Sequence, residues 1–431
     1  MKRSISILTN PTAGLAIFFF ALTLLWTGAF ALAQETVLHS FSDTGTDGYY
    51  PQAGLTFDNK GNLYGTTTNG GGDGLGSVFK VNPQNGDEAP LVNVFSDPSE
   101  GSMPYAGLTF APDEGDQNQG VFWGTTTSGG TDNVGTFFTM TATHGNEGYE
   151  PDDEYSFKTT GLDGETPYGN LLVFGFYAYG TTAFGGAHGN GIVFEVKAGN
   201  GAGNWGEKIL HAFNNNGTDG TNPDAGVITD ASGNLYGTTP VGGANGYGTV
   251  YRLIPKTTGP WAETILYSFN ENGVDGYDSY AGVVLDGSGN LYGTTISGGA
   301  YNGGIVYELT PTESGSWTET ILHNFNVTDG DGFNLNGSLI FDASGNLYGT
   351  TVYGGTYGAG TVFELSPPGM GQTAWTETIL YNFQNTPDGA YPLSNLVFDS
   401  LGNLYGTTQQ GGTNGVGTVF KIATTAKDLL R

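Results

Sequence analysis

One phrase, Gly-Asn-Leu-Tyr-Gly-Thr-Thr, recurs along the chain and constrains its fold more than any other feature. Five copies are complete and two are degenerate. The glycine before each Thr-Thr pair stands at positions 65, 124, 180, 237, 293, 349 and 406, so the spacings are 59, 56, 57, 56, 56 and 57 residues. A period this regular indicates one structural unit that is repeated seven times.

Each unit contains four segments with strand patterns, and the fifth unit shows them clearly. Residues 282–285 form a short apolar run, and a turn that contains Gly289 joins it to a second run at 291–295. A third run follows at 304–309, and residues 319–325 alternate between apolar and polar side chains. Four antiparallel strands in a unit of this length predict a blade of a β-propeller.

The two ends of the chain complement each other. Residues 35–41 match the fourth strand of a unit but have no unit before them, and residues 418–422 match a third strand with no fourth strand after it. Pairing these segments would close a ring and cover two exposed strand edges. We therefore predict an all-β fold, a seven-bladed β-propeller of four-stranded antiparallel blades whose N-terminal strand completes the last blade. A linear stack is the alternative, but its end repeats should be atypical.

The first 33 residues have the three parts of a secretory signal. Lys2 and Arg3 precede a strongly apolar run at 15–25, and Ala31 and Ala33 frame a small-residue cleavage site. We expect cleavage after Ala33 and a secreted or periplasmic protein. An uncleaved membrane anchor is the alternative. The expected divisions are a signal peptide at 1–33, the propeller at 34–424 and a tail at 425–431.

Composition excludes several classes of protein. The chain has 75 glycines, no cysteine and a formal net charge of −29. Without cysteine it cannot be a disulfide scaffold. Its acidity disfavours nucleic acid as a partner. After signal cleavage we expect no membrane association, and we expect a monomer.

The repeat phrases resemble those of a known family. Leu-Tyr-Gly-Thr-Thr, the Gly-Gly loop, Thr-Val-Phe-Glu-Leu and Trp-Thr-Glu-Thr-Ile-Leu recur in order across residues 35–422. In this they resemble the GloVer repeats, a family named after the bacteria Gloeobacter and Verrucomicrobia. The resemblance implies a secreted bacterial propeller, and it transfers no catalytic residue to this chain.

Acidic residues that precede glycine recur where each unit meets the next. The six Asp-Gly turns and one Glu-Gly turn place carboxylates at Asp47, Glu100, Asp163, Asp219, Asp275, Asp331 and Asp388. If these carboxylates ring one face of the disc, they could bind Ca²⁺ or a cationic ligand. The interpretation we favour is that Asp-Gly serves the tight turn itself. We accordingly expect no cofactor, with Ca²⁺ as the open alternative.

Three other repeated positions admit a functional interpretation, and for each we favour a structural one. The first is the Asp-x-x-Gly turn at Asp58, Asp230, Asp286, Asp342 and Asp399, whose side chain we expect to cap the turn. The second holds His39, His211 and His323, where two other units have Tyr267 and Tyr381. Because Tyr substitutes for His, we expect no zinc site. The third is the tryptophan before the fourth strand, which we expect to pack between blades (Trp205, Trp261, Trp317 and Trp375).

The sequence therefore favours a binding or scaffold module for an extracellular glycan or protein, with no catalysis encoded in the repeat. The alternative is a polysaccharide hydrolase or lyase that uses carboxylates in the irregular second and third units, because functional residues are grafted onto repeat folds where the repeat is broken. The candidates for that activity are Asp113, Glu114, Asp116, Glu147, Glu150, Asp152, Asp153 and Glu154.

Overall fold

The computed structural model describes residues 34–86, 88–91, 95–112, 120–142, 149–197, 205–328 and 330–423. These residues form 40 strands and one short 3-10 helix, η1 (Pro98–Glu100). Within them, no helix has the length and apolarity needed to cross a membrane. The expected signal peptide and the expected C-terminal tail lie outside the described residues.

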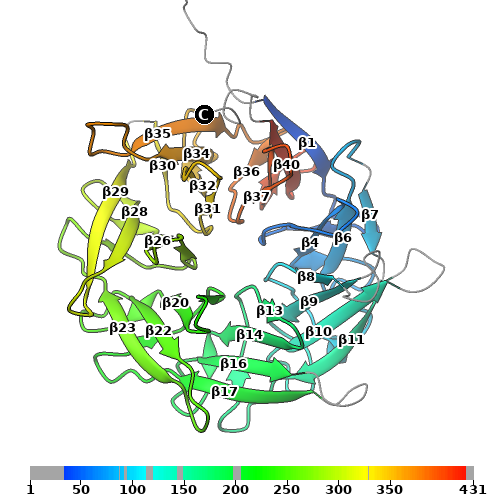
Figure 1. Ribbon diagram of the computed structural model, residues 1–431. Coiled ribbons are helices and arrows are strands. Elements are labelled where there is room, and N and C mark those ends of the chain that lie inside the picture. Colours follow the sequence, from blue (N-terminus) through cyan, green and yellow to red (C-terminus); the bar gives the residue numbers. More distant parts are fainter. Residues whose placement is uncertain are drawn as a thin grey trace, which may run out of the picture. The chain divides into compact units, whose positions relative to one another are not determined.

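The described residues form seven antiparallel sheets of four strands each, arranged as a ring (Figure 1). The prediction of a seven-bladed propeller is therefore confirmed. From the innermost strand outward, the first blade has β3 (Thr56–Phe57), β4 (Leu63–Thr67), β6 (Ser77–Val81) and β7 (Glu88–Leu91), the second has β8 (Thr109–Pro112), β9 (Gly120–Thr126), β10 (Thr136–Ala142) and β11 (Tyr149–Ser156), and the third has β13 (Leu172–Phe174), β14 (Tyr177–Thr182), β16 (Ile192–Lys197) and β17 (Gly206–Ala212). The fourth blade has β19 (Ile228–Thr229), β20 (Leu235–Thr239), β22 (Thr249–Ile254) and β23 (Ala262–Ser268), and the fifth has β25 (Val284–Leu285), β26 (Leu291–Thr294), β28 (Asn302–Pro311) and β29 (Trp317–Asn326). The sixth blade has β31 (Ile340–Phe341), β32 (Leu347–Thr351), β34 (Thr361–Ser366) and β35 (Thr376–Asn382), and the seventh has β37 (Val397–Phe398), β38 (Leu404–Thr408), β40 (Thr418–Ala423) and β1 (Gln34–Ser40).

A two-stranded ribbon accompanies the sheet in six of the blades. In each ribbon, the residues that follow the Asp-Gly aspartate pair with the segment that follows Thr-Thr. The ribbons are β2 (Gly48–Tyr49) with β5 (Asn69–Gly70), β12 (Gly164–Glu165) with β15 (Phe184–Gly185), β18 (Gly220–Thr221) with β21 (Val241–Gly242), β24 (Gly276–Tyr277) with β27 (Ser297–Gly298), β30 (Gly332–Phe333) with β33 (Tyr353–Gly354), and β36 (Gly389–Ala390) with β39 (Gln410–Gly411). The second blade has a single bridge there, between Ser102 and Ser128.

The N-terminal strand closes the ring. β1 pairs with β40 in an antiparallel register that places Glu35 opposite Ile422, so the first described strand is the outer strand of the last blade. Thr407 Oγ1 also donates to the carbonyl of Ala53 at 2.9 Å, which joins the last blade to the first. The closed ring excludes the linear stack.

Pairs of aromatic rings join each blade to the next. A phenylalanine at or just beyond the end of the fourth strand of one blade packs edge-on against an aromatic residue in the third strand of the following blade. Centroid distances of 4.9–5.3 Å characterise all seven pairs: Phe41–Phe79, Phe95–Phe138, Phe157–Phe194, Phe213–Tyr251, Phe269–Tyr307, Phe325–Phe363 and Phe383–Phe420. Such pairs add about 0.5–1.5 kcal/mol beyond the burial of their surface.

The glycine before Thr-Thr makes room for the third-strand aromatic ring of its own blade. A Cβ at Gly293 would lie 2.3 Å from Tyr307 Oη, and a Cβ at Gly65 would lie 2.4 Å from Phe79 Cζ. No real Cβ approaches another atom so closely, so a side chain here would displace the ring. The repeated glycine is therefore a packing requirement of the aromatic pair.

The two threonines of the phrase have separate tasks. In five blades the first donates its hydroxyl to a backbone carbonyl of the next blade, as Thr238 does to Ala281 at 2.8 Å. The second bonds within its own blade, as Thr239 does to the Thr249 hydroxyl at 2.9 Å. The two threonines therefore recur because one bonds within its blade and the other, in five blades, joins it to the next.

Deleting residues 34–42 should lower the melting temperature and cause aggregation, because the last blade would lose its outer strand and Phe79 its partner Phe41. Thermal melting followed by light scattering measures both effects. A matched truncation of residues 425–431 serves as the control. An unchanged melt after the N-terminal deletion would contradict the closed ring.

Replacing Gly293 by Val should cost about 1–3 kcal/mol of unfolding free energy, because the added side chain overpacks the contact with Tyr307. Urea unfolding measures the loss. The matched control is Gly287→Val, because a Cβ at Gly287 meets nothing within 4 Å. Equal effects of the two substitutions would show that the Gly293 contact does not restrict side-chain size.

Candidate functional site

The Asp-Gly aspartates lie in the contacts between blades and bond to their own turns. In all six, Oδ2 accepts a backbone N–H from a residue four or five positions earlier, at 2.8–3.0 Å. The six are Asp47, Asp163, Asp219, Asp275, Asp331 and Asp388. These bonds support the turn interpretation. A role of these residues in ligand binding stays a prediction.

Glu100, at the corresponding place in the second blade, caps a helix instead of supporting an Asp-Gly turn. Its Oε2 accepts the backbone N–H groups of Ser96 and Asp97 at 2.9 and 3.2 Å, and so it completes the N-terminal cap of η1. The seven predicted carboxylates therefore do not form a uniform set.

In five of these contacts, a glutamate from the outer strand of the aspartate's own blade faces the aspartate. Tyr267 Oη lies 3.0 Å from Asp275 Oδ2 and 2.9 Å from Glu319 Oε2, so one phenol touches both carboxyl groups. The five sets are Tyr155/Asp163/Glu207, His211/Asp219/Glu263, Tyr267/Asp275/Glu319, His323/Asp331/Glu377 and Tyr381/Asp388/Glu35. Sequence reasoning missed these glutamates. Their signal is a Glu six residues before five of the seven fourth-strand phenylalanines, but the Tyr or His that it meets belongs to another unit.

Two of the five sets contain histidine. Among the described residues, they are the groups of three potential metal ligands whose nitrogen and carboxylate oxygen atoms lie within 4.8 Å of one another. His211 Nε2 lies 3.3 Å from Asp219 Oδ2 and 3.5 Å from Glu263 Oε1. One imidazole and two carboxylates are donors that Zn²⁺ accepts. In three equivalent sets a tyrosine hydroxyl takes the place of the imidazole, which fits a hydrogen-bonding role at this position in every blade.

The Asp-x-x-Gly aspartates cap their turns, as predicted. Asp286 Oδ1 accepts the backbone N–H groups of Ser288 and Asn290 at 2.8 Å, and Oδ2 accepts the Asn290 amide at 3.0 Å. Burial raises the pKa of Asp399, but hydrogen bonds from Asn403, Tyr405 and Leu401 outweigh it and hold that pKa below its ordinary value. These oxygens are occupied by the protein itself.

The tryptophans pack between blades, as predicted. Trp261 contacts Tyr179 of the preceding blade at a centroid distance of 6.3 Å, and Trp205 contacts Trp123 at 5.3 Å. Trp317 belongs to β29 and packs into a buried cluster with its neighbours.

Residues just before the innermost strands surround the axis of the ring (Figure 1). Two positions further along, adjacent blades bond to each other: Gly107 N–H donates to Asn170 Oδ1 at 2.7 Å, and Gly282 N–H donates to Ser338 Oγ at 2.9 Å. The seven equivalent axial positions hold Gln52, Tyr105, Tyr168, Asp224, Tyr280, Asn336 and Leu393. These seven positions hold five different residue types, so the axis breaks the symmetry of the repeat.

Three tyrosines and one aspartate stand out at these positions, and we name Tyr105, Tyr168, Asp224 and Tyr280 the axial cluster. Tyr105 and Tyr168 pack edge-on with centroids 5.0 Å apart. Burial raises the pKa of Asp224 to about 7. Burial and then the charge of Asp224 raise the pKa of Tyr168 and of Tyr280, so the carboxylate lies close to both phenols. Tyr280 is 38% exposed and the other three side chains are half-buried.

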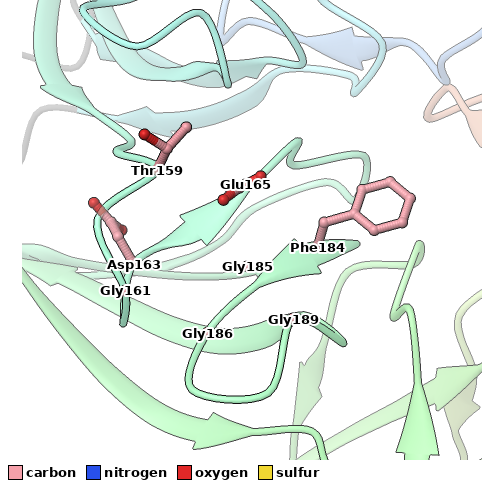
Figure 2. Close-up of a pocket in the computed structure, with 8 residues that line it drawn as sticks. All are labelled: Thr159, Gly161, Asp163, Glu165, Phe184, Gly185, Gly186 and Gly189. Atoms are coloured by element: carbon pink, nitrogen blue, oxygen red, sulfur yellow. The ribbon is translucent and has the colours of Figure 1, made fainter.

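A pocket of about 380 Å³ lies on the third blade (Figure 2). Phe184 of β15 and Glu165 of β12 line it together with Asp163, Thr159 and a loop of glycines. Phe184 is 46% exposed, which leaves its ring accessible to a ligand. Glu165 stands three residues before Tyr168, so the pocket adjoins the axial cluster along the chain.

The structure describes none of the side chains of the eight carboxylates proposed for a hydrolase or lyase. Asp113, Glu114, Asp116 and Glu147 lie outside the described residues. The strand β11 contains Glu150, Asp152, Asp153 and Glu154, but their side chains also lie outside what is described. The proposed catalytic role of all eight stays a prediction.

Solved structures share the fold at low sequence identity. A puromycin hydrolase mutant is 11% identical, with a TM-score of 0.51, over 87% of this chain and 53% of that one. A copper-bound fungal alcohol oxidase of the AA5 family is 15% identical, with a TM-score of 0.50, over 91% and 76%. A putative 6-phosphogluconolactonase from Bacteroides uniformis is 13% identical, with a TM-score of 0.49, over 85% and 95%. At such identities the likeness concerns the fold alone.

Comparison with curated proteins finds no match. The model of the Gloeobacter/Verrucomicrobia repeat matches residues 29–182, 153–332 and 314–430, which together span the whole propeller. The repeat phrases that built the blades are therefore those of the family, and the chain belongs to the Gloeobacter/Verrucomicrobia repeat family.

Proposed function

We propose that this protein is a secreted binding module for an extracellular glycan, and that the axial cluster is its binding site. The observation that carries the proposal is the gathering of Tyr105, Tyr168 and Tyr280 around Asp224 at the axis of the ring. Export through the segment at 1–33 forms part of the proposal.

The location supports a functional role for the cluster. The repeated residues are already occupied: the glycines and aromatic rings pack the blades, the threonines join them, and the aspartates cap turns. The seven axial positions instead hold five different residue types. Function on a repeat fold belongs to sites that are grafted onto it, and the residues that depart from the repeat are the candidates.

The chemistry of the cluster suits a sugar. Ligand sites combine aromatic surface with a few polar groups that fix orientation. Here the tyrosine rings offer flat faces for the apolar face of a pyranose, and the Asp224 carboxylate can accept two hydroxyl groups. The formal net charge of −29 would repel acidic polymers, so we expect neutral or amino-substituted glycans.

The pocket on the third blade supports a ligand longer than one sugar unit. A glycan chain that leaves the axial cluster at Tyr168 would meet Glu165 and then the exposed ring of Phe184. Two aromatic contacts separated along one blade would favour an oligosaccharide over a monosaccharide.

Substitutions in the cluster should weaken binding strongly without affecting the fold. On a glycan array and by titration calorimetry with the best ligand, Tyr168→Ala and Asp224→Asn should each weaken affinity at least tenfold. Because burial raises the pKa of Asp224 to about 7, binding should also weaken as the pH falls through 7. The matched control is Tyr357→Ala, which removes an exposed tyrosine in the loop between β33 and β34.

Three results would contradict the proposal. Equal loss with Tyr357→Ala would show general surface adhesion, and retention of binding in both cluster variants would place the site elsewhere. Release of reducing ends from the bound glycan would favour the hydrolase or lyase alternative.

A further inference from the structure

Three of the blade contacts bring an aspartate and a glutamate together beneath a tyrosine. The aspartate precedes the ribbon of one blade, and the glutamate lies on the outer strand of the same blade, so both face the tyrosine of the blade before. The pairs are Asp163 with Glu207, Asp275 with Glu319, and Asp388 with Glu35. Glu35 lies on β1, so the third pair is part of the contact that closes the ring.

The available donors do not satisfy these carboxyl groups. Tyr267 Oη lies within hydrogen-bonding distance of both Asp275 and Glu319, and Tyr155 Oη lies 2.8 Å from Asp163 and 3.4 Å from Glu207. A phenol has one proton, so it can donate to one carboxyl group at a time.

Buried oxygens without a donor remain at each pair. Glu35 Oε1, Glu207 Oε1 and Glu319 Oε1 are buried, and no hydrogen-bond donor reaches them. A buried acceptor without a donor is costly, and two adjacent ionised carboxylates would also repel each other. One proton held between the two carboxyl groups removes both costs.

We propose that each of these three pairs holds a shared proton, so that the blade contacts, including the closing one, are tight in mildly acidic surroundings and loosen in alkaline ones. Each glutamate, when protonated, donates its O–H to the facing aspartate, and the tyrosine hydroxyl bonds to the same pair. Loss of that proton leaves two negative charges side by side between blades.

The direction of the pKa shifts agrees with this geometry. Burial, followed by the charge of the facing aspartate, raises the pKa of Glu35, Glu207 and Glu319 to about 8 from an ordinary value of 4.5. A group with a raised pKa in the folded state binds more protons there than in the unfolded chain. Its stabilising contribution is therefore complete below pH 4.5 and is lost as the pH rises through 8.

Other titratable groups around the pairs modify this behaviour. Lys158 approaches Glu207 and opposes the rise of its pKa. Tyr307 faces Asp275 and Glu319 from the third strand of their blade, and Tyr381 faces Glu35 and Asp388. Burial holds the pKa of each tyrosine above its ordinary value, so these phenols stay neutral over the range in which the glutamates titrate.

Glu319→Gln tests the shared proton directly, because the amide N–H of Gln can donate to Asp275 at every pH. We expect the melting temperature of this variant to equal that of the wild type at pH 5 and to exceed it by several degrees at pH 9. Glu313→Gln is the matched control, because it removes the same charge from an exposed loop before β29. It should leave the wild-type pH profile unchanged.

A melting temperature for Glu319→Gln that is lowered equally at pH 5 and pH 9 would overturn the proposal, since it would show an ionised glutamate at both. An equal gain in Glu313→Gln at pH 9 would also overturn it, because general repulsion would explain the profile. The infrared carbonyl band of protonated carboxylic acid gives a second measurement on the wild type. Asp224, whose pKa is also raised, contributes to this band in both proteins, so wild type and Glu319→Gln are compared. A band at pH 7 that is weaker in Glu319→Gln supports the proposal, and an equal band in the two proteins contradicts it.

Discussion

The stacking of one phenylalanine against the aromatic ring of the next blade is the contact on which the rest of the structure depends. It recurs seven times at centroid distances of 4.9–5.3 Å. The third-strand ring can lie there only because the second strand has glycine beneath it, as Gly293 lies beneath Tyr307. With the rings in place, the threonine of one blade reaches the next, and each blade is fixed by its neighbours. A loss of stability at one contact would therefore weaken the whole ring.

Much of this architecture could be predicted from the sequence because the repeat carries it. The period gave the number of blades, the incomplete ends gave the closing strand, and the Asp-x-x-Gly turn implied its own cap at Asp286. The glutamate partners could not be predicted in the same way. Glu319 looks like a polar residue in an alternating strand, and only the packing of two blades places it against Asp275 and Tyr267. The axial cluster could not be predicted for a related reason: its residues are about 56 positions apart in the sequence and meet only when the ring closes.

Repetition also separates structural residues from candidates for function. A residue that every blade shares answers a need that every blade has, and the acidic turns illustrate this well. For Asp275 the sequence favours a turn role over a ring of ligand-binding carboxylates, and the residue bonds to its turn and to Tyr267 of the neighbouring blade. Asp224 has no acidic counterpart at the other axial positions, and tyrosines flank it on both sides. That difference is why we place binding at the axis and cohesion at the blade contacts.

A double-mutant cycle on one aromatic pair tests most directly whether these contacts hold the ring together. Phe325→Leu and Phe363→Leu would be made singly and together, and unfolding free energies compared. The account predicts that the two substitutions are coupled by about 0.5–1.5 kcal/mol, as expected for an aromatic pair. Strictly additive effects would contradict it, because each ring would then stabilise its own blade without joining the two.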